Sequence, residues 1–257
     1  MELRPGLHRI GSDLVACYLV VDDDGITLID AGIPGQWPEL LAELEALGRG
    51  LDEIRGVVLT HGDSDHIGFA ERLRREHGVP VFVHAADAAR ARGEEKTSPG
   101  WGRVRLGPTS RFLWYAARRG GLKPEPVREV VPVEAGAVLE LPGRPHLIGM
   151  PGHSPGSVAV HVPAVDAVFV GDALTTGHVL TGAQGPAPAP FTDDPAEALA
   201  SLDRLAGIDA RWVLPGHGAP WSGGVAEASR LVREAAARAS TGPKGPSKAA
   251  QRGHAAH

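Results

Sequence analysis

The stretch Val57–Gly68, with the sequence Val-Val-Leu-Thr-His-Gly-Asp-Ser-Asp-His-Ile-Gly, decides how the rest of this chain is interpreted. It begins as a run of β-branched and apolar residues, which is typical of a buried strand. The run ends in side chains of the types that bind divalent metals, namely His61, Asp63, Asp65 and His66. Glycines bracket this polar cluster and a helical pattern follows it. We therefore expect a turn between a strand and a helix, in which the four side chains converge on one point.

Three later segments repeat this pattern, because each places one further metal-binding side chain at the end of an apolar run. They are Pro-Gly-His153-Ser-Pro-Gly, Val-Gly-Asp172-Ala and Pro-Gly-His217-Gly. A related segment, Leu-Ile-Asp30-Ala-Gly, precedes them all. The repetition makes a metal centre a better explanation than a chance cluster of polar residues.

Taken in order, these motifs resemble those of the metallo-β-lactamase superfamily of hydrolases, over about residues 10 to 220. One position departs from the family pattern, because Asp63 stands where the middle histidine of His-x-His-x-Asp-His is expected. The resemblance implies an α/β fold, an αββα sandwich of two mixed β-sheets flanked by helices. We expect one such domain over residues 1–240 and a disordered tail over residues 241–257.

The resemblance also implies a role for each motif residue at a centre of two divalent metal ions, for which zinc is the expected metal. The first metal would be held by His61, Asp63 and His153, the second by Asp65, His66 and His217, and Asp172 would bridge them. Asp30 would contact the ligands without binding the metal and keep them oriented. We assign Asp65 and Asp30 to catalysis, in which a hydroxide between the metals would attack a carbonyl.

The aspartate at position 63 changes the expected charge of the centre. Its carboxylate can reach as far as a histidine Nδ1, but it makes the centre one unit less positive. We therefore expect a less acidic bound water and a shift from zinc towards manganese or iron. The alternative is that Asp63 binds no metal and only the second position is occupied.

Composition disfavours some classes of partner. The 257 residues carry a net charge of −5 and only 5% aromatic residues, so we expect neither nucleic acid nor a membrane as a partner. The start of the chain lacks a charged and apolar leader pattern, which leads us to expect a cytoplasmic protein. The single cysteine, Cys17, lies in an apolar run and is interpreted as a structural residue.

Alternating and helical patterns predict the remaining elements. Predicted strands are 14–21, 26–29, 79–83, 138–141, 146–150, 158–162, 167–170 and 211–214, and predicted helices are 37–47, 85–92, 195–205 and 225–239. The later strands should form a second sheet on the first. Residues 93–126 mix arginines with Trp101 and Trp114, and we expect a lid or pocket wall, with an interface between copies or a plain surface helix as alternatives. His84 is interpreted as structural, and the orientation of His178 stays open.

The function expected from these features is metal-dependent hydrolysis of a small-molecule ester, thioester, lactone or amide. A thioester or lactone is favoured over a β-lactam, since an aromatic and basic lid suits an acyl or carboxylate-bearing substrate. Two alternatives stay open. One is a phosphodiesterase or nuclease of the same fold, and the other is a metal-binding interaction module that docks through residues 93–126.

Overall fold

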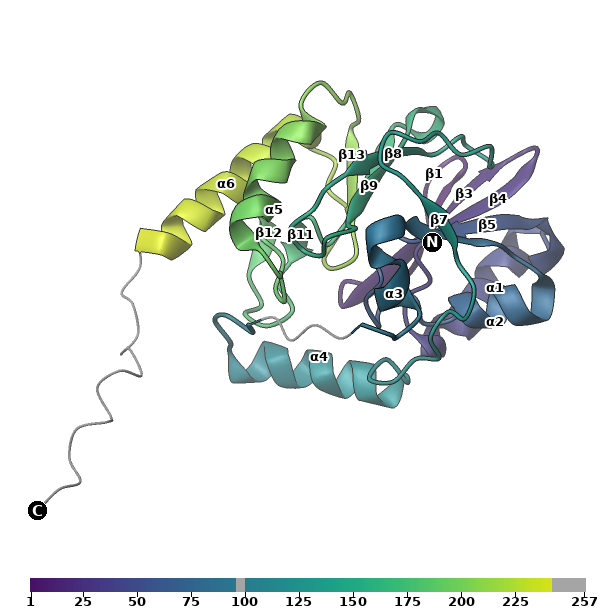
Figure 1. Cartoon of the computed structure of the whole chain (residues 1–257), viewed down its shortest axis with the longest axis horizontal. Coiled ribbons are helices and arrows are strands. Elements are labelled where there is room, and N and C mark those ends of the chain that lie inside the picture. Colours follow the sequence, from purple (N-terminus) through teal and green to yellow (C-terminus); the bar gives the residue numbers. More distant parts are fainter. Residues whose placement is uncertain (96–99, 242–257) are drawn as a thin grey trace, which may run out of the picture.

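The computed structural model describes residues 1–95 and 100–241, so residues 242–257 of the predicted tail lie outside the described residues. Two β-sheets pack face to face, and helices cover the outer side of each (Figure 1). This αββα arrangement of mixed sheets confirms the predicted fold class. No helix in the described ranges is long and apolar enough to cross a membrane.

The first sheet contains, within the described residues, seven strands in chain order. They are β1 (Glu2–Arg4), β2 (Leu7–Ser12), β3 (Val15–Asp22), β4 (Gly25–Ile29), β5 (Ile54–Val58), β6 (Val81–His84) and β7 (Val131–Val133). Strands β1 to β4 are antiparallel, and β4 to β7 run parallel. The parallel part brings the ends of β4 and β5 to one edge, where the first motifs begin.

The second sheet has the strand order β13-β10-β9-β8, and a short ribbon of two strands lies beside it. The bounds are β8 (His146–Gly149), β9 (Val158–Val162), β10 (Ala167–Gly171), β11 (Thr175–Gly177), β12 (Gln184–Ala187) and β13 (Trp212–Pro215). Strands β10 and β13 are parallel, so Asp172 and His217 follow neighbouring strand ends.

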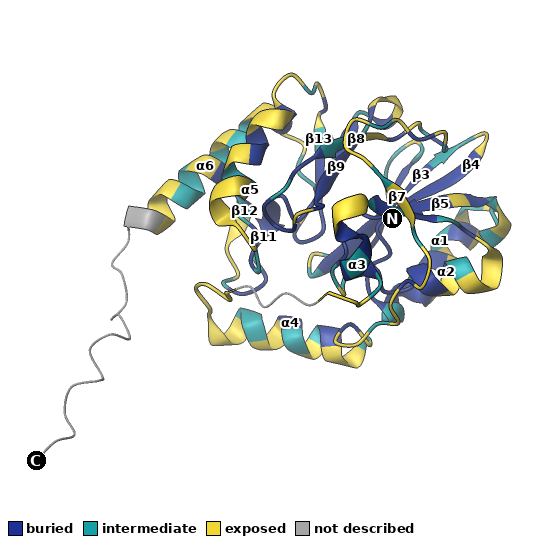
Figure 2. Cartoon of the chain, in the orientation of Figure 1, coloured by how far each residue is buried: buried dark blue, intermediate teal, exposed yellow. Residues whose placement is uncertain are grey.

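Six α-helices complete the described chain. Their bounds are α1 (Trp37–Leu47), α2 (Ala70–His77), α3 (Ala88–Ala91), α4 (Leu106–Arg118), α5 (Pro195–Ser201) and α6 (Val225–Thr241). Leu40 of α1 and Leu73 of α2 pack on the first sheet, whereas Val225 and Val232 of α6 pack on the second. The outer helix faces are exposed, while the central strands of the two large sheets are mostly buried (Figure 2).

The core between the two sheets is apolar, and it fixes the position of one sheet relative to the other. Tyr18 and Phe169 face each other with ring centroids 5.3 Å apart, and the Tyr18 hydroxyl donates to the carbonyl of Pro215 at 2.8 Å. Ile29 and Val58, at the ends of β4 and β5, are also buried there. Each such side chain contributes about 1.5–3 kcal/mol on burial, which makes the strand ends a rigid base for the loops beyond them.

The structure corrects several predicted elements. Residues 138–141 form no strand, because Gly143 and Arg144 turn the chain with positive φ and leave only a bridge from Val138 to His146. Strand β7, which is absent from the predicted strands, is the last strand of the first sheet. Strand β12 lies in a proline- and alanine-rich segment whose composition indicates a loop. Cys17 is buried in β3, as predicted.

Candidate metal centre

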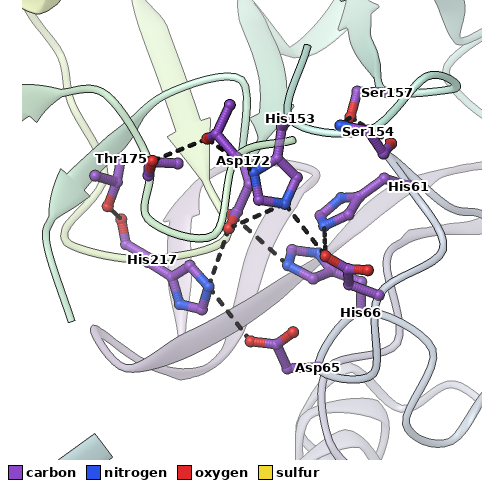
Figure 3. Close-up of polar contacts among 12 residues, drawn as sticks. His61, Asp65, His66, His153, Ser154, Ser157, Asp172, Thr175 and His217 are labelled. Atoms are coloured by element: carbon purple, nitrogen blue, oxygen red, sulfur yellow. Dashed lines mark hydrogen bonds and ion pairs between the residues drawn. The ribbon is translucent and has the colours of Figure 1, made fainter. Parts of the chain in front are cut away.

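Strand ends from both sheets place the candidate ligands at one edge of the sandwich. The loop after β5 carries His61 to His66, and the loops after β8, β10 and β13 carry His153, Asp172 and His217. These side chains point towards one another in Figure 3. A loop after a buried strand has a fixed origin, so chain segments distant in sequence can hold side chains in a defined arrangement.

The seven predicted ligand residues come together as three overlapping groups. In each group, one possible ligand atom per residue lies within 4.8 Å of the others. The groups are His61 with Asp63 and His153, Asp65 with His66 and His217, and His61 with His66 and Asp172. The first two are the sets expected for the first and second metal. Asp172 lies between them, since its carboxylate is 3.2 Å from His217 and 3.9 Å from His153.

Each of the four histidines is held through Nδ1, which leaves Nε2 facing the centre. His66 Nδ1 lies 2.9 Å from Asp30 Oδ2, and His217 Nδ1 lies 2.5 Å from the carbonyl oxygen of Leu14. The carbonyl can only accept, so His217 carries a proton on Nδ1. Asp30 is itself fixed, because it accepts a hydrogen bond from the backbone N–H of Thr60 at 2.7 Å.

The other two histidines contact threonine hydroxyls whose own protons are already used. The Thr60 hydroxyl donates to Asp30, so it accepts from His61 Nδ1 at 3.1 Å. The Thr192 hydroxyl donates to the carbonyl of Ala189, so it accepts from His153 Nδ1 at 3.3 Å. Such partners behind a histidine fix its tautomer and orientation, and they leave the Nε2 lone pair available to a metal.

Among the described residues, three buried atoms at this point have none of the hydrogen-bond partners that buried polar groups normally have. They are His61 Nε2, His66 Nε2 and Asp172 Oδ1, which belong to one of the three ligand groups. A buried polar atom without a partner costs about 1–3 kcal/mol. Because all three atoms face the same small region, divalent cations held by the ligand groups there would satisfy them. The donor set, imidazole nitrogens with carboxylate oxygens, is suited to zinc and iron.

The pKa values of the histidines in the cluster are shifted in a way that fits a cation site. Burial alone would lower the pKa of His66, but the carboxylates of Asp30, Asp65 and Asp172 outweigh it and raise that pKa to about 9. Asp172 and Asp65 likewise raise the pKa of His217 against the effect of burial. Burial lowers the pKa of His61. Excess negative charge thus recruits protons to two histidines, at positions where a metal cation would compete with them.

Sequence reasoning missed two residues of the short segment 85–92. Asp87 is fully buried and accepts hydrogen bonds from Gly62 N–H at 2.8 Å and Gly156 N–H at 2.7 Å, so it joins two ligand loops. Arg90 is also buried and contacts Asp63. An alanine-rich helix gives no sign of such contacts, although an acid and a base three residues apart share one helix face.

The remaining predicted residues lie around the cluster. His84 belongs to none of the ligand groups; it caps a helical turn by accepting the N–H of Ala86. His178 lines a large cavity beside the site. Within residues 93–126 the structure has helix α4, whose buried Phe112 packs against the His217 ring at 5.8 Å. The surface helix that is one of the alternatives for residues 93–126 is therefore present, and it contacts the site.

The fold and this cluster agree with the match of residues 10–217 to the family model of the metallo-β-lactamase superfamily. The chain belongs to that family. Among its relatives is the probable metallo-hydrolase YflN of Bacillus subtilis (strain 168), which is 29% identical over 86% of this chain and 87% of its own. Rv2581c of Mycobacterium tuberculosis (strain ATCC 25618 / H37Rv) is 31% identical over 79% of this chain and 85% of its own.

Solved structures show the same relation. TTHA1623 in a di-iron-bound form is 30% identical and superimposes with a TM-score of 0.60, covering 88% of this chain and 98% of that one. A metallo-β-lactamase family protein of Thermus thermophilus, TTHA1429, has a TM-score of 0.67 at 24% identity and covers 92% of this chain and 81% of that one. The second likeness concerns the fold alone.

Proposed function

We propose that this protein is a metal-dependent hydrolase that cleaves an ester, thioester, lactone or amide of a small molecule. The observation that carries the proposal is the pair of ligand groups joined by Asp172, with three orphaned buried atoms facing one region. Held by these residues, two divalent cations would supply a nucleophilic water near neutral pH and polarise the carbonyl that it attacks. We propose zinc for these positions, with iron or manganese as alternatives.

The protein's own side chains have distinct tasks in this proposal. Asp63 and His153 would hold the first metal with His61, while Asp65 and His217 would hold the second with His66. Asp30 would keep His66 oriented through its Nδ1. The side chains of Asp63 and Asp65 are 25% and 19% exposed, compared with 1% for His61, so a substrate would approach from the carboxylate side.

A large apolar cavity beside the centre supports an acyl substrate. It has a volume of about 970 Å³, and its walls include Phe191, Leu199 and Ala235. None of the seven candidate ligands lines it; the connection runs through Ala173, next to Asp172, and Thr192, which contacts His153. A substrate could therefore place its chain in the cavity and its carbonyl at the centre.

The rim of this cavity adds a preference for negative charge. Arg103 and Arg105 line it together with Trp101, whose ring meets Phe191 at 5.5 Å. Trp101 and Val104 are about half exposed. Exposed aromatic and apolar side chains beside arginines suit an amphiphile with an apolar chain and an anionic group. We therefore favour acyl thioesters and acyl lactones, with residues 100–119 as the lid.

A substrate panel tests this proposal. Zinc-loaded protein would be assayed with thioesters and lactones of increasing acyl length, a β-lactam and a phosphodiester. We expect kcat/KM for thioesters or lactones to rise by up to about fourfold per added methylene, because each buried methylene contributes about 0.8 kcal/mol. Ala235→Trp should remove the chain-length dependence, whereas Ala226→Trp, at an exposed position of the same helix, should keep it. Turnover of the phosphodiester alone would contradict the proposal.

A further inference from the structure

Arg90 lies in α3 with only 7% of its surface exposed, and its guanidinium contacts two carboxylates. Its Nε lies 2.5 Å from Asp63 Oδ1, and its Nη1 lies 2.7 Å from Asp193 Oδ2. A buried arginine held by two carboxylates has a fixed position, since the planar guanidinium has its donors in a rigid fork. The family pattern that identifies the candidate ligands assigns this residue no role.

The two oxygens of Asp63 consequently have different partners. Oδ1 is taken by Arg90, whereas Oδ2 lies 3.3 Å from His153 Nε2 and 3.6 Å from His61 Nε2. A histidine at this position would offer a single nitrogen to a metal, but a free carboxylate offers two equivalent oxygens and can rotate between them. With Arg90 in place, one oxygen alone faces the candidate metal position.

The positive charge of Arg90 also acts on the candidate metal centre. Asp63 makes the centre one unit more negative than a histidine would, and Arg90 brings one positive charge into contact with it. Opposite charges at such short range attract strongly where burial keeps water away from them. Asp193, on another nitrogen of the guanidinium, is about as exposed as Asp63 (24% against 25%) and offsets part of that positive charge, so the remainder acts at Asp63. The shift towards manganese or iron expected from Asp63 alone is therefore opposed.

Arg90 also connects Asp63 with the loop that supports His153. The backbone N–H of Asp193 donates to the carbonyl of His153 at 3.1 Å, and the adjacent Thr192 contacts the His153 ring. A displacement of Arg90 would thus move two of the three candidate ligands of the first metal. The ion pairs of Arg90 within the described chain go to Asp63 and Asp193, and neither belongs to the second ligand group, Asp65 with His66 and His217.

We propose that Arg90 is a positioning residue for the first metal: it fixes Asp63 as a ligand with one oxygen and offsets the charge that this aspartate adds. The inference rests on the proposed metal centre, since it needs a metal beside His61, Asp63 and His153. It predicts that Arg90 and Asp63 are useful only together. A histidine at position 63 would leave Arg90 only its pair with Asp193, so its remaining effect on the first metal should be small.

A double-mutant cycle tests this coupling by zinc binding, independently of turnover. The four proteins are the parent, Arg90→Met, Asp63→His and the double variant, each stripped with a chelator and titrated with zinc against a chromophoric competitor. We expect Arg90→Met to weaken the first zinc by about 10- to 100-fold, as is typical for lost partners of ligands. The second zinc should change by less than about threefold. In the Asp63→His background, Arg90→Met should leave the first zinc unchanged or tighten it.

Controls separate this role from a structural one. Arg92→Met alters a partly exposed arginine that pairs with Glu94, two residues further along the chain, and should leave both zinc affinities unchanged. If Arg90→Met does not fold, Arg90→Lys keeps the charge without the fork and should weaken the first zinc selectively. Cobalt spectra of the same variants report whether the geometry of the first position changes.

Two results would overturn the inference. Equal losses on Arg90→Met in both backgrounds, or equal losses at both metal positions, would show a general structural effect. A parent that binds a single zinc and gains a second on Arg90→Met would show that Arg90 holds Asp63 away from the metal. A parent that binds no metal at all would instead contradict the proposed function, so the two failures are distinguishable.

Discussion

Asp87→Ala should destabilise the protein strongly, although this residue belongs to none of the candidate ligand groups. The side chain is fully buried and accepts three hydrogen bonds, from Gly62 N–H at 2.8 Å, Gly156 N–H at 2.7 Å and the Ser154 hydroxyl at 2.7 Å. These donors belong to the loops that carry His61 and His153. The carboxylate therefore holds two ligand loops from opposite sheets in one place.

The size of the effect follows from what the truncation leaves behind. Hydrogen bonds to a charged acceptor contribute about 1.5–3 kcal/mol each, and the buried carboxylate itself costs desolvation, which its removal returns. The Ser154 hydroxyl keeps Ser157 as a partner at 2.8 Å, but the two backbone N–H groups are orphaned. We expect a net loss of about 4 kcal/mol, because three such hydrogen bonds outweigh the desolvation that the truncation returns. That corresponds to a decrease in Tm of about 8–16 °C.

Urea unfolding followed by circular dichroism, in the presence of a chelator, measures this loss without any contribution from metal. Asp23→Ala is the matched control, because this aspartate is exposed in the turn between β3 and β4 and should cost less than about 0.5 kcal/mol. Asp87→Asn keeps one acceptor oxygen and should fall between the two. A loss below about 1 kcal/mol for Asp87→Ala would refute the reasoning, since the two orphaned N–H groups alone should exceed it.

Three further predictions concern the centre itself. Zinc binding at pH 7 should release at least one proton, because the pKa of His66 is raised to about 9 and zinc must displace that proton. Zinc affinity should therefore fall about tenfold per pH unit as the pH decreases below 9. Calorimetry in two buffers of different ionisation enthalpy measures the proton release, and the absence of any release would contradict this prediction. Gly216→Ala should abolish binding of the second zinc, since an added Cβ would lie 2.5 Å from His66 Cε1 and 2.8 Å from Asp172 Oδ1. The control Gly107→Ala, whose added Cβ meets nothing within 4 Å, should bind two zinc ions like the parent. Equal zinc stoichiometry in both variants would contradict this steric argument. Asp30→Asn should weaken the second zinc by about 10- to 100-fold through His66, and an unchanged competitive titration would show that Asp30 does not orient this histidine.

Local sequence patterns could predict the strands and the ligand motifs at their ends, whereas the αββα arrangement and the grouping of the ligands follow from the resemblance to the family. Each ligand motif follows an apolar strand, and parallel neighbours such as β10 and β13 necessarily bring their following loops together. The strands predicted over 14–21 and 26–29 are also found, as Val15–Asp22 and Gly25–Ile29, because each is an apolar run in the sequence. Ligation itself stays a prediction that metal analysis must test.

The residues that could not be predicted act across long sequence distances. Arg90 meets Asp63 and Asp193, which are 27 and 103 residues away, and Asp87 meets Gly156, which is 69 residues away. No periodicity encodes such contacts, because they depend on how the two sheets pack. The charge expected for the centre from the sequence therefore does not include Arg90. The strand predicted for residues 138–141 is absent for the opposite reason: their composition is typical of a strand, but the turn at Gly143 and Arg144 prevents it.

The most direct test of the central claim is the zinc stoichiometry of the protein and two of its variants, measured by titration after chelator treatment and checked by elemental analysis. The two ligand groups predict two zinc ions per chain for the parent, and one each for His153→Ala and His217→Ala, which belong to different groups. A parent that binds no zinc, or variants that both keep two zinc ions, would contradict a centre built from these seven side chains.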